Sequence, residues 1–176
     1  MSRRAWLITL VGLGVALWVV GLALVLGADG DGDGGGSALP GTIPGEITPV
    51  PDDAPAFARP FLQVRAALGE ECFDLLLADT PERRTQGLRG VADPSPWAGM
   101  LFAHPEPATT GFTMAGVPTG LTIGWYDATG RRLGTAEMAA CDGDDVSCPS
   151  YVPPAPWIYA VEFPLGTLPP GALGSC

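Results

Sequence analysis

The chain of 176 residues contains no lysine, so all nine of its basic residues are arginine. Its formal net charge is −10, and residues 61–176 alone carry six Arg against thirteen Asp and Glu. A protein that binds nucleic acid needs a clustered basic face to neutralise phosphates. This composition therefore argues against nucleic acid and against other polyanions as partners.

The sequence also lacks the short motifs that identify common catalytic and metal-binding sites. It has one histidine, no Cys-x-x-Cys pair, no Gly-x-Ser-x-Gly turn and no phosphate-binding loop. Zinc and dithiol redox sites depend on closely spaced Cys and His ligands. A serine hydrolase of the α/β type depends on the nucleophile turn. We therefore expect neither a metal nor a cofactor, and no catalytic residue can be assigned from a motif.

An uncharged stretch at residues 5–28 follows two arginines, Arg3 and Arg4. As a helix its twenty-four residues would span about 36 Å at about 1.5 Å per residue. The hydrocarbon core of a bilayer is about 30 Å thick. We predict a single-pass signal anchor in the cytoplasmic (plasma) membrane, with the lipid bilayer as its partner. A cleaved signal peptide is the alternative, although its apolar core is usually shorter.

The charge around this stretch predicts its orientation. Arginines precede it and three aspartates, at positions 29, 31 and 33, follow it closely. Positive charge is retained on the cytoplasmic side. We expect the N-terminus inside and everything after Ala28 outside the cytoplasm.

Residues 29–60 are rich in Asp, Gly and Pro and predict a flexible, disordered linker. Asp29-Gly-Asp31-Gly-Asp33-Gly34 also matches the opening of an EF-hand calcium loop. That loop needs a glutamate at its twelfth position, where this chain has Pro40. The linker is the better interpretation.

Residues 61–176 predict one mainly β domain outside the cytoplasm, a small β-barrel or sandwich with one short helix. A helix is expected from Pro81 to about Gly87, because Thr80 can cap it and Pro81 suits its first position. The expected strands cover residues 72–78, 100–103, 111–114, 121–127, 131–138 and 157–163. A hairpin turn is expected at residues 127–130, with Gly130 at positive φ.

The four cysteines all lie in this outer segment, where disulfides persist. Three pairings are open. Cys141 and Cys148 bracket a turn-rich loop that one bridge would close. Cys72 opens a strand and Cys176 is the last residue, so a second bridge between them would fix the C-terminus. We expect these two pairs.

Five residues are weak candidates for a functional surface: His104, Met114, Trp125, Glu137 and Glu162. His104 is the only histidine, and a general base normally needs an orienting carboxylate. Glu137 and Glu162 occupy strand positions where paired carboxylates could form a site. Trp125 belongs to an aromatic-rich half that would supply either core side chains or a surface for stacking sugars.

A series of short motifs resembles a known family. It runs through residues 78–83 (Ala-Asp-Thr-Pro-Glu-Arg), 87–88 (Gly-Leu), 99–102 (Gly-Met-Leu-Phe) and 105–107 (Pro-Glu-Pro), and continues with Phe112-x-Met114, Cys141 to Tyr151 and Val161-Glu162. Over about residues 72–168 the chain resembles the bacterial and archaeal domain of unknown function 192. The resemblance implies a compact β-barrel or sandwich with one short helix, often exported. It implies no established activity.

This chain departs from the family pattern at polar positions. Relatives typically carry Gly-Leu-Met-x-Arg after the helix, where this chain has Gly-Leu-Arg-Gly-Val at residues 87–91. They carry Trp, Lys, Asn and Asp where this chain has Thr113, Ala115, Gly116 and Thr122. Acid–base chemistry needs titratable groups. We therefore expect no cluster of two or more titratable side chains around residues 112–123.

Two classes of function follow. The first is a non-catalytic module in the cell envelope that binds a protein, a peptide or a glycan. The second is an enzyme that acts on a substrate of the cell envelope. A pocket lined by convergent titratable groups would favour the enzyme. An exposed aromatic or apolar patch would favour the binding module.

Overall fold

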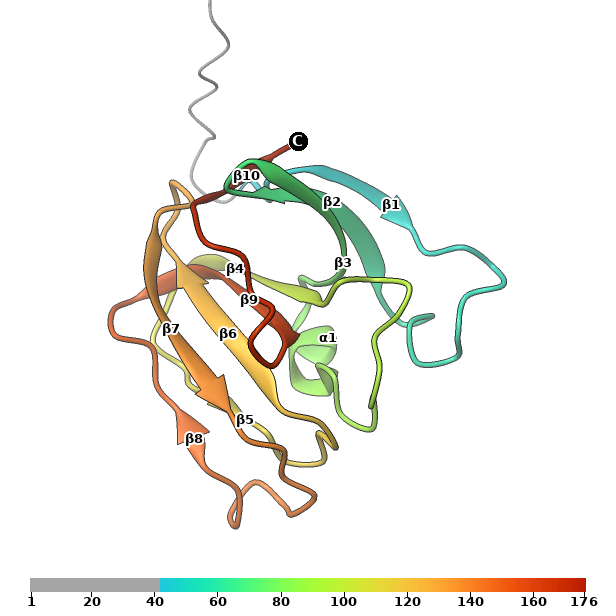
Figure 1. The fold of residues 1–176 in the computed structure, drawn as a ribbon, viewed down its shortest axis with the longest axis vertical. Helices are drawn as coiled ribbons and strands as arrows, with labels where there is room; N and C mark the ends of the chain where they lie inside the picture. Colours follow the sequence, from blue (N-terminus) through green and yellow to red (C-terminus); the bar gives the residue numbers. More distant parts are fainter. Residues whose placement is uncertain (1–41) are drawn as a thin grey trace, which may run out of the picture. The chain divides into compact units, whose positions relative to one another are not determined.

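A computed structural model describes residues 42–176, and its largest element is one mixed sheet of eight strands (Figure 1). In chain order the elements are β1 (Glu46–Pro49), β2 (Leu62–Leu68), β3 (Glu71–Ala78), α1 (Pro81–Gln86), β4 (Met100–Ala108), β5 (Phe112–Thr113), β6 (Leu121–Tyr126), β7 (Arg132–Met138), β8 (Ser150–Tyr151), β9 (Trp157–Pro164) and β10 (Leu173–Ser175). The sheet order is β1-β2-β3-β4-β9-β6-β7, with β10 also paired to β2. Strands β5 and β8 form a separate two-stranded sheet.

The end strands of the large sheet, β1 and β7, do not pair with each other in the described part of the chain, so the sheet is not closed. The prediction of a mainly β domain with one short helix is confirmed, and the barrel alternative is wrong. Closure requires every strand to have two partners and a matching stagger around the ring. Here the ladder ends at β7.

Apolar side chains cover both faces of the sheet. The first core, on one face, includes Met100, Ile123, Trp125, Trp157 and Ala160. The second core, on the other face, includes Leu75, Leu77, Tyr126, Tyr159, Val161 and Phe163. Strand β9 supplies both cores, because successive side chains of a strand point to opposite faces.

Helix α1 begins and ends as its sequence predicts. The Thr80 hydroxyl accepts a hydrogen bond from the Arg83 backbone N–H, and Pro81 takes the first helical position. Gly87 ends the helix at a φ of 47°. The hairpin turn at Asp127–Gly130 is confirmed as well, with Gly130 at a φ of 77° and its N–H donated to the Asp127 carbonyl.

The predicted linker reaches into the described residues, and there it is packed. Strand β1 pairs with β2 in register from Glu46 opposite Arg65 to Pro49 opposite Leu62. Ala54 and Ala58 are buried in the first core. An edge strand tolerates a proline, and small alanines fit against a core without demanding space. The folded part therefore begins before residue 61, and residues 29–41 lie outside the described range.

Both disulfides are present, and the predicted pairing is confirmed. Cys72 bonds to Cys176 across 104 residues, and Cys141 bonds to Cys148 across 7. On the loop-entropy model these bridges stabilise the fold by about 5 and about 2.5 kcal/mol, respectively. The long bridge secures β10 against the start of β3.

The predicted membrane span at residues 5–28 also lies outside the described range. From residue 42 to residue 176, no helix is long and apolar enough to cross a bilayer.

Gly99 allows the start of β4 to lie directly against β9. A Cβ atom placed on Gly99 would come within 1.9 Å of the Glu162 carbonyl oxygen. We predict that Gly99→Ala lowers the free energy of unfolding by at least about 2 kcal/mol, because the obstacle is backbone and has no flexible end that could move. Urea unfolding of the full chain measures this change.

Gly174→Ala is the matched control. A Cβ there meets no atom within 4 Å. Its expected effect is within about 0.5 kcal/mol. Equal stability of the two variants would contradict the close approach of β4 to β9.

Candidate ligand-binding cavity

The structure separates the five candidate residues. His104 on β4 and Glu162 on β9 line the same open cavity, which has a volume of about 590 Å³. Met114 and Trp125 are buried in the first core and do not line it. Glu137 is exposed on β7 and is not part of the lining. Only two of the five therefore share a site.

Three aromatic rings form one wall of the cavity, which we call the aromatic wall: Phe102, Phe112 and Trp157. The Phe102 and Phe112 rings meet edge to face with centroids 5.1 Å apart, and the Phe112 and Trp157 centroids are 5.2 Å apart. The Trp157 indole N–H donates to the Thr110 carbonyl, which fixes the ring. The wall is therefore held in place by its own packing, and Phe112 is its most exposed ring, because Phe102 and Trp157 are only 3% and 1% exposed.

Glu162 is the buried carboxyl of the cavity, with 5% of its surface exposed. Its directly opposite neighbours are Met100 on β4 and Ile123 on β6, both in the first core. Residues paired in this way point to the same face of the sheet, so the carboxyl is flanked by apolar groups. Burial raises the pKa of Glu162 from its ordinary value of 4.5 to about 8.

No side chain in residues 42–176 forms a hydrogen bond or an ion pair with Glu162. A buried polar group without a partner costs free energy. The carboxyl avoids the larger cost of a buried charge by keeping its proton at neutral pH. It is thus a neutral group that can donate or accept a hydrogen bond inside the cavity.

His104 lies beside the aromatic wall, with its ring edge to face on Trp157 at a centroid distance of 4.8 Å. Desolvation lowers the pKa of His104, and the nearby positive charge of Arg84 lowers it further. The imidazole is therefore uncharged at neutral pH. No hydrogen bond joins it to Glu162 within the described chain.

Arg84 on α1 also lines the cavity. Its Nη1 donates to the carbonyls of Asp79 and Ala103, each at 2.8 Å, and so ties the helix to β4. Of the four ion pairs in the described part of the chain, none includes Arg84. Arg84 therefore lines the cavity without a direct ion pair, and the exposed carboxylate of Glu82 on the same helix lies within range of its charge.

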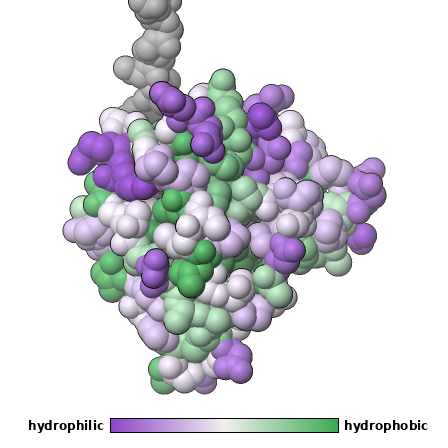
Figure 2. Space-filling view, viewed as in Figure 1, coloured by the Kyte–Doolittle hydropathy of each residue, from purple (hydrophilic) through white to green (hydrophobic). Residues whose placement is uncertain are grey.

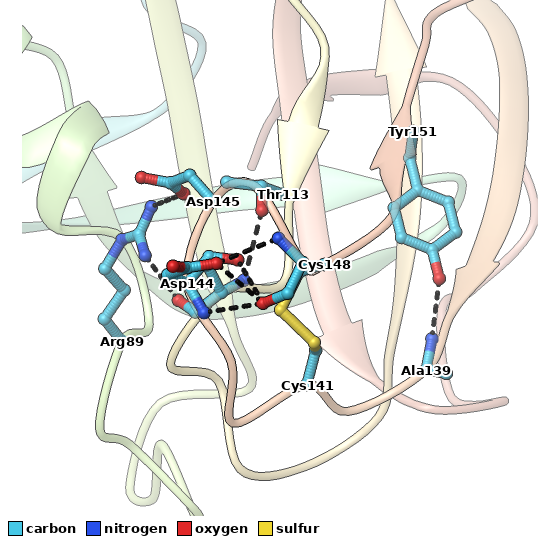
Figure 3. The surroundings of a disulfide bond; sticks show 10 residues. Arg89, Thr113, Ala139, Cys141, Asp144, Asp145, Cys148 and Tyr151 are labelled. Carbon is cyan, nitrogen blue, oxygen red and sulfur yellow. Dashed lines mark hydrogen bonds and ion pairs between the residues drawn. A yellow bond between two sulfur atoms is a disulfide. The ribbon is translucent and has the colours of Figure 1, made fainter.

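At the rim of the cavity Arg89 joins three segments of the chain (Figure 3). It donates to the Thr85 carbonyl, to the Ala115 carbonyl and to the Asp145 carboxylate, the last at 2.7 Å. Asp145 belongs to the disulfide loop, residues 141–148, which the bridge between Cys141 and Cys148 closes. The bridge thus holds one side of the rim in place.

The expectation that no titratable side chains gather near residues 112–123 is wrong. Phe112, Thr113 and Val117 line the cavity together with five titratable residues: Arg84, Arg89, His104, Asp145 and Glu162. These five come from four separate segments of the chain. Their convergence depends on strand order, which the local sequence does not specify.

The positions that differ from the family pattern have other roles. The Thr113 hydroxyl accepts from the Ala115 backbone N–H, and Ala115 is fully buried. Gly116 has a φ of 71°, which favours glycine. The Thr122 hydroxyl accepts from the Gly166 N–H. Only Thr113 of these four lines the cavity.

Metal binding finds no support in this geometry. In residues 42–176 no three His, Cys, Asp or Glu side chains lie close enough together to hold an ion.

Two solved structures share this mainly β fold. One, of a protein of unknown function from Novosphingobium aromaticivorans DSM 12444, is 19% identical, with a TM-score of 0.54 over 64% of this chain and 84% of that chain. The other, of a putative transcription regulator from Sinorhizobium meliloti 1021, is 23% identical, with a TM-score of 0.54 over 64% of this chain and 93% of that chain. At these identities the likeness concerns the fold alone. No curated protein matches the chain.

A family model identifies the chain more specifically. The model of DUF192, described as "Uncharacterized ACR", matches residues 63–170. The chain belongs to this family, as the motifs around α1 and β4 predict. The family supplies no activity, so any function must be argued from the cavity.

Sequence reasoning named Glu162 and His104 but missed the residues around them. Glu162 is detectable as a lone acid in the apolar run Trp157–Phe163. Arg84 and Arg89 carry no comparable signal, because arginines near the end of a short helix usually face solvent. The aromatic wall was missed because its members lie far apart in sequence.

Glu162 makes the stability of the domain depend on pH. The folded chain keeps this proton up to about pH 8, whereas an unfolded chain releases it near 4.5. The folded state therefore binds more protons between these values, and the free energy of unfolding falls as pH rises through that window. The expected slope is up to about 1.4 kcal/mol per pH unit, and the contribution is constant below it. We predict that Glu162→Gln removes this slope, as urea unfolding at several pH values would measure.

Glu137→Gln is the control for this experiment, because Glu137 is an exposed glutamate on β7 outside the cavity. It should leave the slope of the unmodified chain intact. A Glu162→Gln variant with the same pH dependence as the unmodified chain would show that the buried carboxyl does not hold its proton.

Proposed function

We propose that this protein is a non-catalytic binding module whose cavity holds a small ligand with an apolar, ring-bearing body. The observation that carries the proposal is the combination of the aromatic wall with Glu162, a buried carboxyl that lacks a partner among residues 42–176. Ligand sites are typically concave, mostly apolar and equipped with a few convergent polar groups. This cavity is concave and has convergent polar groups, and its apolar part is formed by the aromatic wall with Leu88 and Val117.

The size of the cavity is consistent with such a ligand. Its volume of about 590 Å³ falls within the range of roughly 300–1,000 Å³ that small-molecule sites occupy. Flat faces of aromatic rings stack on sugars, on other rings and on apolar chains. A ligand could also accept a hydrogen bond from the protonated Glu162 carboxyl, which lines the cavity.

A broad apolar docking patch is a weaker explanation on the face that Figure 2 shows. Hydrophobic and hydrophilic side chains are interspersed there. The large apolar residues that are exposed in the described chain are Ile47, Val146, Val152 and Leu165. These four come from separate segments. A small ligand in the cavity therefore suits the domain better than a wide protein interface.

The proposed setting is the outer side of the cytoplasmic membrane, with the domain tethered through residues 5–28. Two disulfides in one small domain favour an oxidising compartment. The charge asymmetry around the apolar stretch favours an N-terminus inside. In this setting the ligand would come from an envelope glycan, an envelope protein or the surrounding fluid.

A second candidate is an enzyme that acts on an envelope substrate. It is favoured by one specific observation: His104 and Glu162 line the same cavity, and burial raises the pKa of Glu162 to about 8, nearer to the neutral range that acid–base catalysis needs. The pKa of His104 moves the other way, below its ordinary value of 6.5, because the imidazole is desolvated. Against it, no hydrogen bond connects the two or orients His104 through a carboxylate in residues 42–176. Conversion of a bound ligand into a product would establish the enzyme.

We expect the cavity to bind ring-bearing fragments saturably. The full chain, labelled with ¹⁵N, is titrated with a panel of aromatic fragments and simple sugars, and the shifts of the Phe112 amide and the Trp157 indole N–H are followed. Phe112→Ala should weaken binding about tenfold or more, because it removes the central ring of the aromatic wall. If no member of the panel shifts these signals, the binding function is wrong.

Val152→Ala is the matched control for this substitution. Val152 is 69% exposed and lies outside the cavity lining. Its removal should leave affinity unchanged. Equal losses in both variants would mean that the fragments bind elsewhere.

The proposed topology has its own test. A reporter fused after Cys176 that is active only outside the cytoplasm should be active in cells. The matching reporter that is active only in the cytoplasm should be silent. The opposite result would place the domain inside and leave the disulfides unexplained.

A further inference from the structure

Arg84 is the charged group that distinguishes this cavity. Four arginines in the described chain, at positions 65, 83, 89 and 131, form ion pairs with aspartates. Arg84 is half-buried, lines the cavity and forms no such pair with any residue from 42 to 176. A half-buried positive charge that no carboxylate contacts directly is available to pair with an anionic ligand.

The hydrogen bonds that Arg84 does form leave one edge of its guanidinium unused. Nη1 donates to the carbonyls of Asp79 and Ala103. Neither Nε nor Nη2 donates to any group in the described residues. The Nε and Nη2 hydrogens point in parallel and match the two oxygens of a carboxylate. The two carbonyls hold the guanidinium in place, so a ligand would not have to order it.

The other titratable groups around the cavity add no competing charge at neutral pH. Glu162 keeps its proton and His104 is neutral, because burial shifts both pKa values in the uncharged direction. Arg89 and Asp145 balance each other at the rim. Arg84 is therefore the one charged side chain of the cavity lining that forms no direct ion pair with residues 42–176, in a chain whose net charge is −10.

We infer that the ligand is a monocarboxylate with a ring-bearing, apolar body, whose carboxylate pairs with the free edge of Arg84 while its body lies on the aromatic wall. This inference rests on the proposed binding function and names the chemical class of its ligand. The single positive charge of Arg84 matches the single negative charge of a monocarboxylate. A phosphate dianion would bring a second negative charge into a cavity that is partly closed by apolar rings.

The test compares two probes that differ only in charge. 3-Phenylpropionate carries a ring and a carboxylate, and 3-phenylpropanamide is its neutral isostere. Both are titrated into the full chain by calorimetry or NMR near pH 6.5, at low salt, where Glu162 is protonated. The carboxylate should bind at least tenfold more tightly than the amide, and added salt should reduce that ratio.

Arg84→Gln should reduce the ratio to about threefold or less, since a glutamine keeps a polar side chain but carries no charge. The matched control is Arg59→Gln. Arg59 is an exposed arginine outside the cavity and forms no ion pair within the described chain. This control should retain the full preference.

Three outcomes would overturn the inference. If both probes bind equally to the unmodified chain, the cavity is a ligand site without carboxylate selectivity, and the proposed function survives. If the Arg84→Gln variant still binds the carboxylate more tightly than the amide, another group of the protein interacts with the charge of the ligand. If neither probe nor any fragment of the panel binds, the proposed function itself fails. The comparison of probes on the unmodified chain holds even where the variant does not fold.

Discussion

Strand β9 is paired along both of its edges, with β4 on one side and β6 on the other. This double pairing buries the run from Trp157 to Phe163 on both faces of the sheet. The same strand supplies side chains to the two cores and places Trp157 and Glu162 at the cavity. Gly99 makes the arrangement possible, because only a residue without a Cβ can lie so close to the Glu162 carbonyl. The cavity therefore depends on the pairing of β9 with both β4 and β6.

Electrostatics in this cavity depend on burial more than on pairing. Glu162 has no partner in the described chain and stays neutral, whereas Arg84 cannot lose its proton and stays charged. Placing an acid and a base in one cavity would normally produce an ion pair. Here desolvation is the one cause that shifts the pKa of Glu162, so the charge of Arg84 has little effect on this carboxyl. The two groups therefore present different chemistry to a ligand, a hydrogen-bonding acid and a fixed cation.

The cavity also separates this chain from the pattern of its family. Residues that replace polar family positions, such as Ala115 and Gly116, act through their backbones. The Ala115 carbonyl accepts from Arg89, and Gly116 makes a turn at positive φ. The titratable groups of the cavity come from α1 and the turn after it, from β4, from the disulfide loop and from β9.

The sequence by itself determined the local features of the protein. Thr80 and Pro81 start the helix and Gly130 forms the hairpin turn, because each of these features depends on residues that are near in sequence. The two disulfides were predictable because four cysteines allow only three pairings. Strands β1, β2, β8 and β10 were not predicted, since short or alanine-rich strands owe their conformation to their partners. Only the tertiary structure decided that Arg84 and Glu162 share a cavity with the aromatic wall. The physical reason is that strand order sets which distant side chains meet, and burial then sets their charge.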